Sequence, residues 1–353
     1  MSRCLELALL GAGHVAPNPM VGAVLLYTDA ATGEERIIGE GYHERYGEKH
    51  AEVNCIDAVK EADRPLIEKS TLFVSLEPCV HYGKQPPCAD LIIEKRIPRV
   101  IAGCRDPFPE VNGKGIEKLR GAGVDVQVGL LERACKELNR RFFTANTLHR
   151  PYIILKWAQT ADGKIAGPGR RFISNEYSNR LVHRWRAEES AILVGTATAM
   201  LDDPALTVRL WDGVNPVRLV VDKELRLPHS LQLFDGKVRT IVFNRIKHGE
   251  AGGVEYYQIS PDSSLVHQLS MALAQLKLQS VLVEGGAMLL QSFIDEGYWD
   301  EARVITNNEL LIPAGLAAPV LAGASLEREE CLSGDSIRIY FNRPVPGRGW
   351  ANG

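Results

Sequence analysis

The sequence has little of what marks a secreted, membrane-bound or nucleic-acid-binding protein. Its seven cysteines are an odd number scattered along 353 residues, which argues against a disulfide scaffold and for a reducing compartment. Glu6 interrupts the apolar start of the chain, so the N-terminus makes a poor signal peptide. No apolar run approaches the ~18 residues of a membrane span, and a net charge of −3 argues against binding nucleic acid through its phosphates. We therefore expect a cytoplasmic protein with no membrane and no nucleic-acid partner.

Composition and length indicate two globular domains. The chain is 45% hydrophobic and 24% charged, as in proteins that bury sizeable cores, and 353 residues exceed one ordinary domain. Pro151 ends a linking helix and a new strand begins at Tyr152, which puts the boundary near residues 147–151. We predict domains of residues 1–147 and 148–353, both α/β because strands and helices alternate in each.

A histidine and two cysteines form the clearest chemical pattern. His50 is followed by Glu52, and Cys79 and Cys88 follow downstream. Singly, each would more often be a core histidine or core thiol, but jointly they favour zinc with an open position for water, which zinc acidifies. Glu52 is suited to move protons beside that water. The pattern matches the zinc deaminase signature, except that Cys88 follows Cys79 by nine residues instead of three.

The zinc motif is predicted to lie on an α/β framework. Apolar residues at helical spacing predict a helix over Ala51–Ala62, so His50 and Glu52 can both point into one pocket at its N-terminus. A strand over Thr71–Ser75 runs into the turn that carries Cys79. The other elements predicted in this half are a hairpin of Met20–Tyr27 and Arg36–Tyr42, strands at Arg99–Gly103 and Asp125–Val128, and helices from near Cys88, near Ile116–Arg120 and from Leu131 to about Ala145.

A glycine pair is the main feature of the second half. A strand over Ser280–Glu284 runs into Gly285-Gly286 and a helix over about Ala287–Glu296. This arrangement can offer free N–H groups to a phosphate, although such a pair is more often only a tight turn, and the residues alone favour the turn. The other predicted elements are strands at Tyr152–Trp157, Ala191–Gly195, Val217–Val221, Thr240–Phe243 and Val254–Tyr257, and helices at Asn175–Glu188 and about Ser263–Leu278.

Longer motifs surround these residues along nearly the whole chain. In the first half they are Asn18–Gly22, His50–Val53, Leu76–Cys79, His81–Cys88 and Asp106-Pro107; in the second they are Lys156–Ile165, Asp202–Arg209 and Val283–Gly286. Together they resemble the RibD family of bifunctional riboflavin-biosynthesis proteins, whose deaminase half has the long loop between the cysteines. The resemblance implies a cytidine-deaminase-like N-terminal domain and a dihydrofolate-reductase-like C-terminal domain.

For the deaminase half, the resemblance implies that His50, Cys79 and Cys88 hold Zn²⁺ and that Glu52 is catalytic. The substrate would be a phosphoribosylaminopyrimidine. The residues implied to line its site are Asn18, His43, Lys84 and Asp106. Without the resemblance, turn chemistry, a surface charge and a loop cap would explain Asn18, Lys84 and Asp106. Phe108 departs from the family, which commonly has an asparagine there, so a polar contact is either missing or supplied by Asn112.

For the reductase half, the resemblance implies NADPH as the hydride donor and Lys156 as an acid or orienting group. Arg186 and Arg209 have fork-shaped donors that suit a phosphate, although a surface ion pair is the alternative for either. The stretch 167–174 departs from the family, which makes Arg170 and Phe172 the least secure positions. The implied cofactor residues are Gln159, Phe172, Thr198, Asp202, Lys223, Gly286, Ala287 and Met288, and the implied substrate residues are Arg170, Arg186, Leu206, Arg209 and Glu284.

The predicted function is zinc-dependent deamination of 2,5-diamino-6-(5-phosphoribosylamino)pyrimidin-4(3H)-one, followed by NADPH reduction of its ribosyl group to ribityl. The partner is this small molecule, and we expect a homo-oligomer, a dimer or a tetramer. One alternative is a nucleoside or tRNA deaminase with an appended domain of other function, against which the near-neutral charge and the long Cys79–Cys88 loop count. Another is a non-catalytic zinc module, which has no use for a carboxylate at Glu52. Neither alternative explains the second half.

Overall fold

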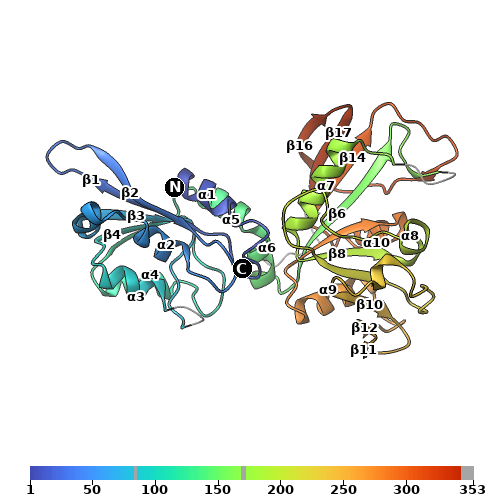
Figure 1. Cartoon of the computed structure of the whole chain (residues 1–353), viewed down its shortest axis with the longest axis horizontal. Helices are drawn as coiled ribbons and strands as arrows, with labels where there is room; N and C mark the ends of the chain where they lie inside the picture. The colour runs from blue at the N-terminus through green and yellow to red at the C-terminus, as the bar shows by residue number, and fades with distance from the viewer. Residues whose placement is uncertain (83–85, 168–171, 343–353) are drawn as a thin grey trace. The chain divides into compact units, whose positions relative to one another are not determined.

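The computed structural model describes residues 1–82, 86–167 and 172–342. Two of the predicted site residues, Lys84 and Arg170, lie outside these ranges. The chain divides into two compact units, Met1–His149 and residues 150–353 (Figure 1), which we describe one at a time. In the described ranges, no helix is both long and apolar enough to cross a membrane.

The first unit is built on a five-stranded sheet in the order β2-β1-β3-β4-β5. Strand β1 pairs antiparallel with β2 and β3, and β3, β4 and β5 run parallel, so the predicted hairpin is confirmed. The strands are β1 (Gly22–Thr28), β2 (Glu35–Tyr42), β3 (Ser70–Val74), β4 (Arg99–Ala102) and β5 (Asp125–Val128); the helices are α1 (Ser2–Leu9), α2 (Ala51–Asp57), α3 (Cys88–Glu94), α4 (Lys114–Gly121), α5 (Glu132–Leu138) and α6 (Arg140–Thr147), with a 3-10 helix, η1 (Glu61–Lys69).

Helices cover both faces of this sheet. Residues of α2, α3 and α4, such as Ile56, Ile92 and Leu119, share one apolar cluster with Leu25 of β1. On the other face, Leu7 of α1 packs with Val24, the residue of β1 that precedes Leu25. Neighbouring strand residues therefore face opposite layers, as the pleat requires.

Two predicted helices have the wrong extent. The helix expected over 51–62 ends at Asp57, and the chain continues as the 3-10 helix η1, which contains Pro65; proline cannot donate the backbone hydrogen bond of an α-helix. The helix expected over 131–145 is split into α5 and α6 at Asn139. The Asn139 amide accepts the N–H of Met20 and donates to its carbonyl, each at 2.8 Å.

The second unit contains a ten-stranded sheet in the order β11-β12-β10-β9-β8-β13-β6-β14-β17-β16 and a small pair, β15-β7. The strands from β12 to β14 run parallel, and β11, β17 and β16 are antiparallel to their neighbours. The strands are β6 (Tyr152–Thr160), β7 (Lys164–Ala166), β8 (Ala191–Gly195), β9 (Val217–Val221), β10 (Thr240–Asn244), β11 (Gly249–Ala251), β12 (Val254–Gln258), β13 (Ser280–Gly285), β14 (Glu301–Asn307), β15 (Leu316–Ala317), β16 (Ala324–Leu332) and β17 (Asp335–Asn342).

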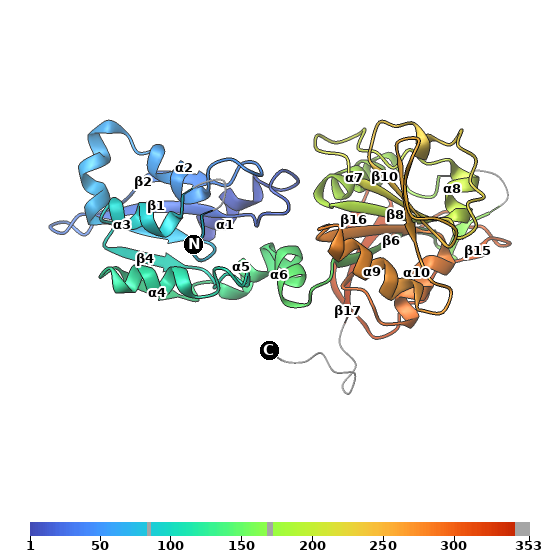
Figure 2. The same cartoon turned by 90° about the horizontal axis from the view of Figure 1, so that it is seen from below.

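Helices again lie on the two faces of the large sheet (Figure 2). Leu269 of α9 and Phe293 of α10 belong to the cluster that contains Ile153 of β6, whereas Trp185 of α7 packs in the cluster of Ile154, the next residue. The parallel strands place their carboxyl ends along one edge, where ligands of such sheets commonly bind. The helices are α7 (Glu176–Glu188), α8 (Thr196–Asp202), α9 (Leu265–Gln275) and α10 (Ala287–Asp295), with a 3-10 helix, η2 (Gln232–Phe234).

Candidate active sites

Three metal-binding side chains converge at the N-termini of α2 and α3. His50 is the N-cap of α2, Cys79 lies in the loop after β3, and Cys88 is the first residue of α3. The Nδ1 atom of His50 lies 3.5 Å from the Cys79 sulfur and 3.3 Å from the Cys88 sulfur. A nitrogen and a sulfur bound to one tetrahedral zinc are about 3.5 Å apart. The donor set therefore fits zinc, with one position left for water.

The surroundings favour a thiolate at Cys79 and a protonatable carboxyl group at Glu52. Hydrogen bonds from the Cys88 thiol, the His50 imidazole and the Cys88 backbone N–H lower the pKa of Cys79 to about 4, and the thiolate is the form that binds a metal. Glu52 lies buried in the first turn of α2. Burial and then the charge of Cys79 raise the pKa of Glu52, which suits a group that takes and returns a proton.

Asn18 and His43, two predicted substrate residues, lie together beside the metal ligands. The His43 Nδ1 atom is 3.0 Å from the Lys49 carbonyl oxygen, and its Nε2 atom is 3.1 Å from the Asn18 amide nitrogen. With Nδ1–H donating to that carbonyl, Nε2 accepts from the amide and fixes the direction of the Asn18 oxygen. The His43 ring lies edge-on to His50, with 5.5 Å between centroids. Burial lowers the pKa of His43, which favours the neutral ring.

Asp106 is buried near the same site. Burial, and after it the charges of Glu77 and Cys79, raise the pKa of Asp106 to about 7, against the hydrogen bond from Phe108. That bond joins the Phe108 N–H to the Asp106 carboxylate at 2.8 Å. The Phe108 ring lies edge-on to His81, with 5.7 Å between centroids. The Asp106 carboxylate is thus fixed by the backbone of Phe108, whose ring packs on His81.

Asn112, suggested by the sequence as a source of the polar contact that Phe108 lacks, stays a prediction for substrate binding. Asn112 is exposed, and its backbone N–H donates to the Phe108 carbonyl oxygen at 3.0 Å. Lys84, predicted to line the same site, lies outside the described residues.

A second candidate site lies at the carboxyl ends of β8, β9 and β13. Gly286 is the N-cap of α10, and Gly285 has a φ of +126°, which side chains rarely adopt. A Cβ atom at Gly286 would lie 3.2 Å from the Thr198 hydroxyl oxygen on α8, so the backbone passes close to that helix. The N–H groups of Ala287 and Met288 open α10 at this point. Backbone N–H groups at the start of a helix suit a phosphate, so the phosphate-bearing cofactor expected here stays a prediction.

A partly buried ion pair lies among the predicted reductase residues. Arg186 of α7 donates to Glu284 of β13 through Nε at 2.8 Å and Nη2 at 2.7 Å, and its Nη1 donates to the Thr207 carbonyl at 3.3 Å. Burial would raise the pKa of Glu284, but the charges of Arg186 and then Lys156 outweigh it and lower that pKa to about 2. Burial lowers the pKa of Lys156. The Arg186 guanidinium therefore binds the Glu284 carboxylate in this structure.

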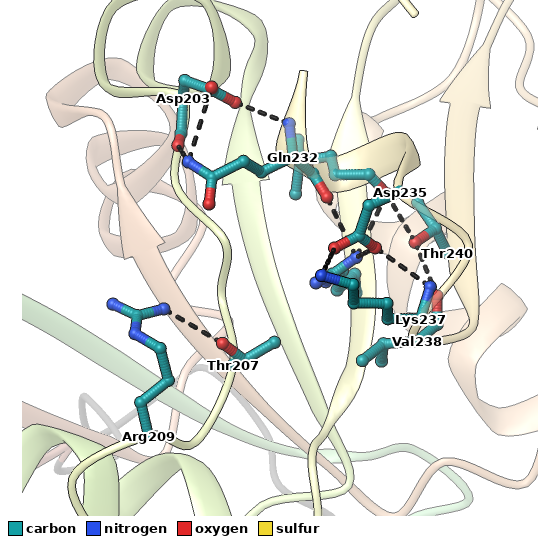
Figure 3. Close-up of polar contacts among 10 residues, drawn as sticks. Asp203, Thr207, Arg209, Gln232, Asp235, Lys237, Val238 and Thr240 are labelled. Atoms are coloured by element: carbon teal, nitrogen blue, oxygen red, sulfur yellow. Dashed lines mark hydrogen bonds and ion pairs between the residues drawn. The ribbon is translucent and has the colours of Figure 1, made fainter. Parts of the chain in front are cut away.

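Arg209 is the more accessible guanidinium beside this pair. Its Nη1 donates to the Thr207 hydroxyl at 3.0 Å (Figure 3), and its backbone N–H donates to His183 Nδ1 at 3.1 Å. His183 is buried on α7, and burial together with Arg186 and Arg209 lowers its pKa to about 4. A neutral His183 thus holds the backbone of Arg209 in place, while the side chain can reach an anion.

The loop that carries Arg209 is also held at its start. The Asp203 carboxylate accepts the backbone N–H of Gln232 at 2.7 Å, and the Asp203 carbonyl accepts the Gln232 side-chain amide at 2.7 Å (Figure 3). Leu206, further along this loop, is buried in an apolar cluster with a φ of +49°. Only the backbone of Leu206 is therefore available to a substrate.

The remaining predicted cofactor residues have varied surroundings. Gln159 accepts the indole N–H of Trp157 at 2.8 Å, which fixes its amide at the end of β6. Exposed residues are Phe172, Asp202 and Met288, and Lys223 is half-buried. Arg170 lies outside the described residues.

Glu77 and His183 carry no signal in the sequence that assigns them a role. Glu77 is part of the motif before Cys79, but its hydrogen bonds come from residues about 30 to 40 positions later. His183 is one of several polar residues on α7, and its partner Arg209 is 26 positions away. Only the folded chain brings these groups together.

Both halves match known families. Residues 1–104 match the family described as cytidine and deoxycytidylate deaminase zinc-binding region, and residues 151–311 match the RibD C-terminal domain. A riboflavin biosynthesis protein RibD from Aquifex aeolicus is 37% identical over 97% of both chains, and that from Escherichia coli is 34% identical over 88% of this chain and 87% of its own.

A solved structure is similar over nearly the whole length. It is a diaminohydroxyphosphoribosylaminopyrimidine deaminase/5-amino-6-(5-phosphoribosylamino)uracil reductase from Thermotoga maritima, 36% identical, with a TM-score of 0.87 over 97% of both chains. The predicted fold class, an α/β deaminase-like unit followed by an α/β reductase-like unit, is confirmed by these matches.

Proposed function

The chain belongs to the RibD family and is a deaminase and reductase of riboflavin biosynthesis; on this premise we propose its substrates and the roles of its residues. The first substrate is 2,5-diamino-6-(5-phosphoribosylamino)pyrimidin-4(3H)-one, and the second is the deaminated product, whose ribosyl group is reduced to ribityl. The observation that carries the proposal is the convergence of His50, Cys79 and Cys88 beside the buried Glu52. A nucleoside or tRNA deaminase would not account for the RibD C-terminal domain.

In the deaminase unit, His50, Cys79 and Cys88 would hold zinc, which supplies a water acidified toward neutral pH. The Glu52 carboxylate would take a proton from the attacking water and deliver it to the departing amino group, so that the oxygen of water replaces the amino group on the ring and ammonia leaves. Asn18 reads the pyrimidine edge with its oriented amide, supported by His43. Asp106 and Lys84 complete the substrate contacts.

In the reductase unit, residues of α8 and α10 would hold NADPH, which would supply the hydride. Gly286, Ala287 and Met288 offer backbone N–H groups to its phosphates, and Thr198 lines the same cradle. The other cofactor contacts are Gln159, Phe172, Asp202 and Lys223.

Charged groups at the neighbouring site would hold the second substrate. Arg209 contacts the substrate phosphate, while Arg186 holds Glu284 in the orientation needed for the sugar hydroxyls. Lys156 places its positive charge near the carbon that receives hydride. Leu206 contributes its backbone and Arg170 a further contact.

We assign the deaminase role to residues 1–147 and the reductase role to residues 148–353. The division of the structure near residue 149 supports this boundary. The chain is proposed to act in the cytoplasm as a homo-oligomer, a dimer or a tetramer, which light scattering during size-exclusion chromatography measures.

The test follows NADPH consumption by absorbance from two starting compounds. With the diaminopyrimidine substrate, wild type should oxidise NADPH, whereas Glu52→Gln should be slower by at least 100-fold, since general acid–base groups contribute about 10²–10⁴. With the deaminated intermediate, both proteins should react equally. Glu61→Gln, which changes an exposed glutamate of the same unit, is the matched control.

The outcomes separate the two halves of the proposal. If wild type oxidises no NADPH even from the intermediate, the reductase role is wrong. If Glu52→Gln keeps full activity from the diaminopyrimidine while holding one zinc per chain, Glu52 is not the proton carrier.

A further inference from the structure

Glu77 is a buried carboxylate two residues before the zinc-ligand position Cys79. It is 3% exposed, and backbone N–H groups fill both of its oxygens. Oε2 accepts from Asp106 at 3.2 Å and Gly113 at 3.0 Å. Oε1 accepts from Gly115 at 2.9 Å and Ile116 at 3.2 Å. These four bonds satisfy both oxygens of a carboxylate that is shielded from water inside the unit.

The four donors belong to one segment, from the loop after β4 into the first turn of α4. The N–H groups of Gly115 and Ile116 are among those that a helix leaves without partners at its N-terminus, and a carboxylate at that end is favoured by the helix dipole. Glu77 therefore caps α4 from another part of the chain. The Glu77 backbone N–H also donates to the Cys104 carbonyl at 3.0 Å, which ties the same loop a second time.

Close backbone packing joins α4 directly to the turn that carries Cys79. A Cβ atom at Gly115 would overlap the carbonyl oxygen of Pro78, the residue that precedes Cys79. Only glycine leaves room for this approach. Glu77 is thus joined through the chain to the turn that carries Cys79. Its carboxylate is joined by a hydrogen bond to the backbone of Asp106, the proposed substrate residue.

We propose that Glu77 is a positioning residue of the deaminase site, which sets the distance between the Cys79 turn and the Asp106 loop. This inference rests on the proposed roles of Cys79 and Asp106. Glu77 itself contacts neither metal nor substrate. It acts through the backbone of the 106–116 segment, and its loss would let that segment move away from the zinc ligands.

The substitution Glu77→Gln preserves size and removes half of the acceptor capacity. Whichever way the new amide lies, its NH₂ group faces two backbone N–H donors, so the glutamine side chain can satisfy only two of the four bonds. We expect deaminase kcat/KM to fall about 10–100-fold, the range for outer partners of metal sites. Most of this should appear as a higher KM, because the Asp106 loop is released.

Zinc should remain at one ion per chain in Glu77→Gln but should be released faster. The measurement is the rate of transfer to a chromogenic chelator, which does not depend on catalysis. Glu117→Gln is the matched control, since Glu117 lies exposed on the same helix α4 and the substitution is identical. Oxidation of NADPH from the deaminated intermediate should be unchanged in both variants.

A merely structural role predicts a different pattern. A partly unfolded variant would lose kcat in proportion to its folded fraction, keep its KM, and exchange backbone hydrogens faster throughout residues 1–149. The positioning role predicts faster exchange concentrated in residues 105–117, read by mass spectrometry. If Glu77→Gln is too unstable to purify, Gly115→Ala tests the same coupling between α4 and the Cys79 turn, because its Cβ atom would press on the Pro78 carbonyl and the Glu77 side chain and should likewise raise KM and speed zinc release.

The outcomes are distinguishable from failure of the proposed function. If wild type neither deaminates the diaminopyrimidine nor holds zinc, the proposed function and this inference are overturned together. If wild type does both, and Glu77→Gln matches Glu117→Gln in KM and zinc release, only the inference is overturned. A raised KM with faster zinc release and local exchange supports it.

Discussion

At the scale of single residues, charged side chains of the reductase unit are held either by a neutral histidine or by an opposite charge. His183 accepts the backbone N–H of Arg209, and Arg186 and Glu284 neutralise each other inside the unit. Removing one partner of a buried pair is far more costly than its net contribution, because the other charge stays buried. Loss of either Arg186 or Glu284 is therefore expected to destabilise the reductase unit as well as its site.

Acidification should destabilise the reductase unit through His183. The folded pKa of about 4 lies below the ordinary value of 6.5, so the fold favours the neutral ring, and this stabilisation is complete above pH 6.5. It is lost as pH falls from 6.5 to about 4, by about 3 kcal/mol in total at 1.36 kcal/mol per pKa unit. Thermal unfolding followed between pH 7.5 and 4 measures the loss.

His183→Asn should flatten this part of the pH dependence, because its amide oxygen can accept a hydrogen bond and does not titrate in the range. The matched control is His229→Asn, which removes an exposed histidine of the same unit and should leave the wild-type slope unchanged. Equal slopes for wild type and His183→Asn would show that His183 is not the titrating group.

Removal of the metal should separate the two activities. Cys88→Ser replaces a zinc ligand, so zinc content and deamination should both fall by at least tenfold, while NADPH oxidation from the deaminated intermediate continues. Cys331→Ser changes an exposed thiol and should retain zinc. Metal analysis and the two-substrate assay read both effects; full zinc content in Cys88→Ser would remove Cys88 from the ligand set.

At the scale of elements, caps and breaks decide where helices end. Asn175 accepts the N–H of Ser178 at 2.9 Å to cap α7, and its amide donates to the carbonyls of Leu332 and Ser333 near the β16–β17 turn. One side chain therefore joins the start of α7 to a hairpin far along the chain.

Asn175→Ala should lower the unfolding free energy of the reductase unit by about 2 kcal/mol, at the upper end of the range for N-caps because further bonds are lost. Ser264→Ala removes the N-cap of α9, which accepts one backbone N–H, and should cost about 1 kcal/mol. Urea unfolding monitored by tryptophan fluorescence measures both. A smaller loss for Asn175→Ala than for Ser264→Ala would contradict the joining role.

The strands and helices that the sequence predicts well are those whose signal is local. The strands Asp125–Val128, Ala191–Gly195 and Val217–Val221 agree with the structure residue by residue. The break at Asn139 could not be predicted, because it depends on a contact with Met20, 119 positions earlier. No helix or strand is predicted beyond Glu296, although β14 and β17 add to the large sheet through long-range pairing.

The difference between local and long-range signals also applies to the sites. The spacing of the zinc ligands can be recognised in the sequence, and the structure brings their side chains together. The pairing of Arg186 with Glu284, and the four bonds to Glu77, join residues far apart in sequence. The sequence does not show whether the guanidinium of an arginine binds a carboxylate of the protein or a ligand.

At the scale of the whole molecule, one chain carries two catalytic units that use different ligands. The predicted combination of a deaminase half and a reductase half is confirmed by relatives that match nearly the full length. Each unit has its own sheet and its own apolar clusters. Each is therefore expected to have a stability that responds to its own ligand.

Zinc and NADPH should stabilise different transitions of the intact chain. A ligand that binds only the folded state adds about 2.7 kcal/mol at a hundred times its Kd. NADPH should therefore raise the Tm of the unit that begins at Arg150, whereas chelation of zinc should lower only that of residues 1–149, as measured by calorimetry. In Cys88→Ser, the chelator should have no effect and NADPH its full effect. A single transition that moves with either ligand would contradict two independent units, because coupled units must share every ligand's stabilisation.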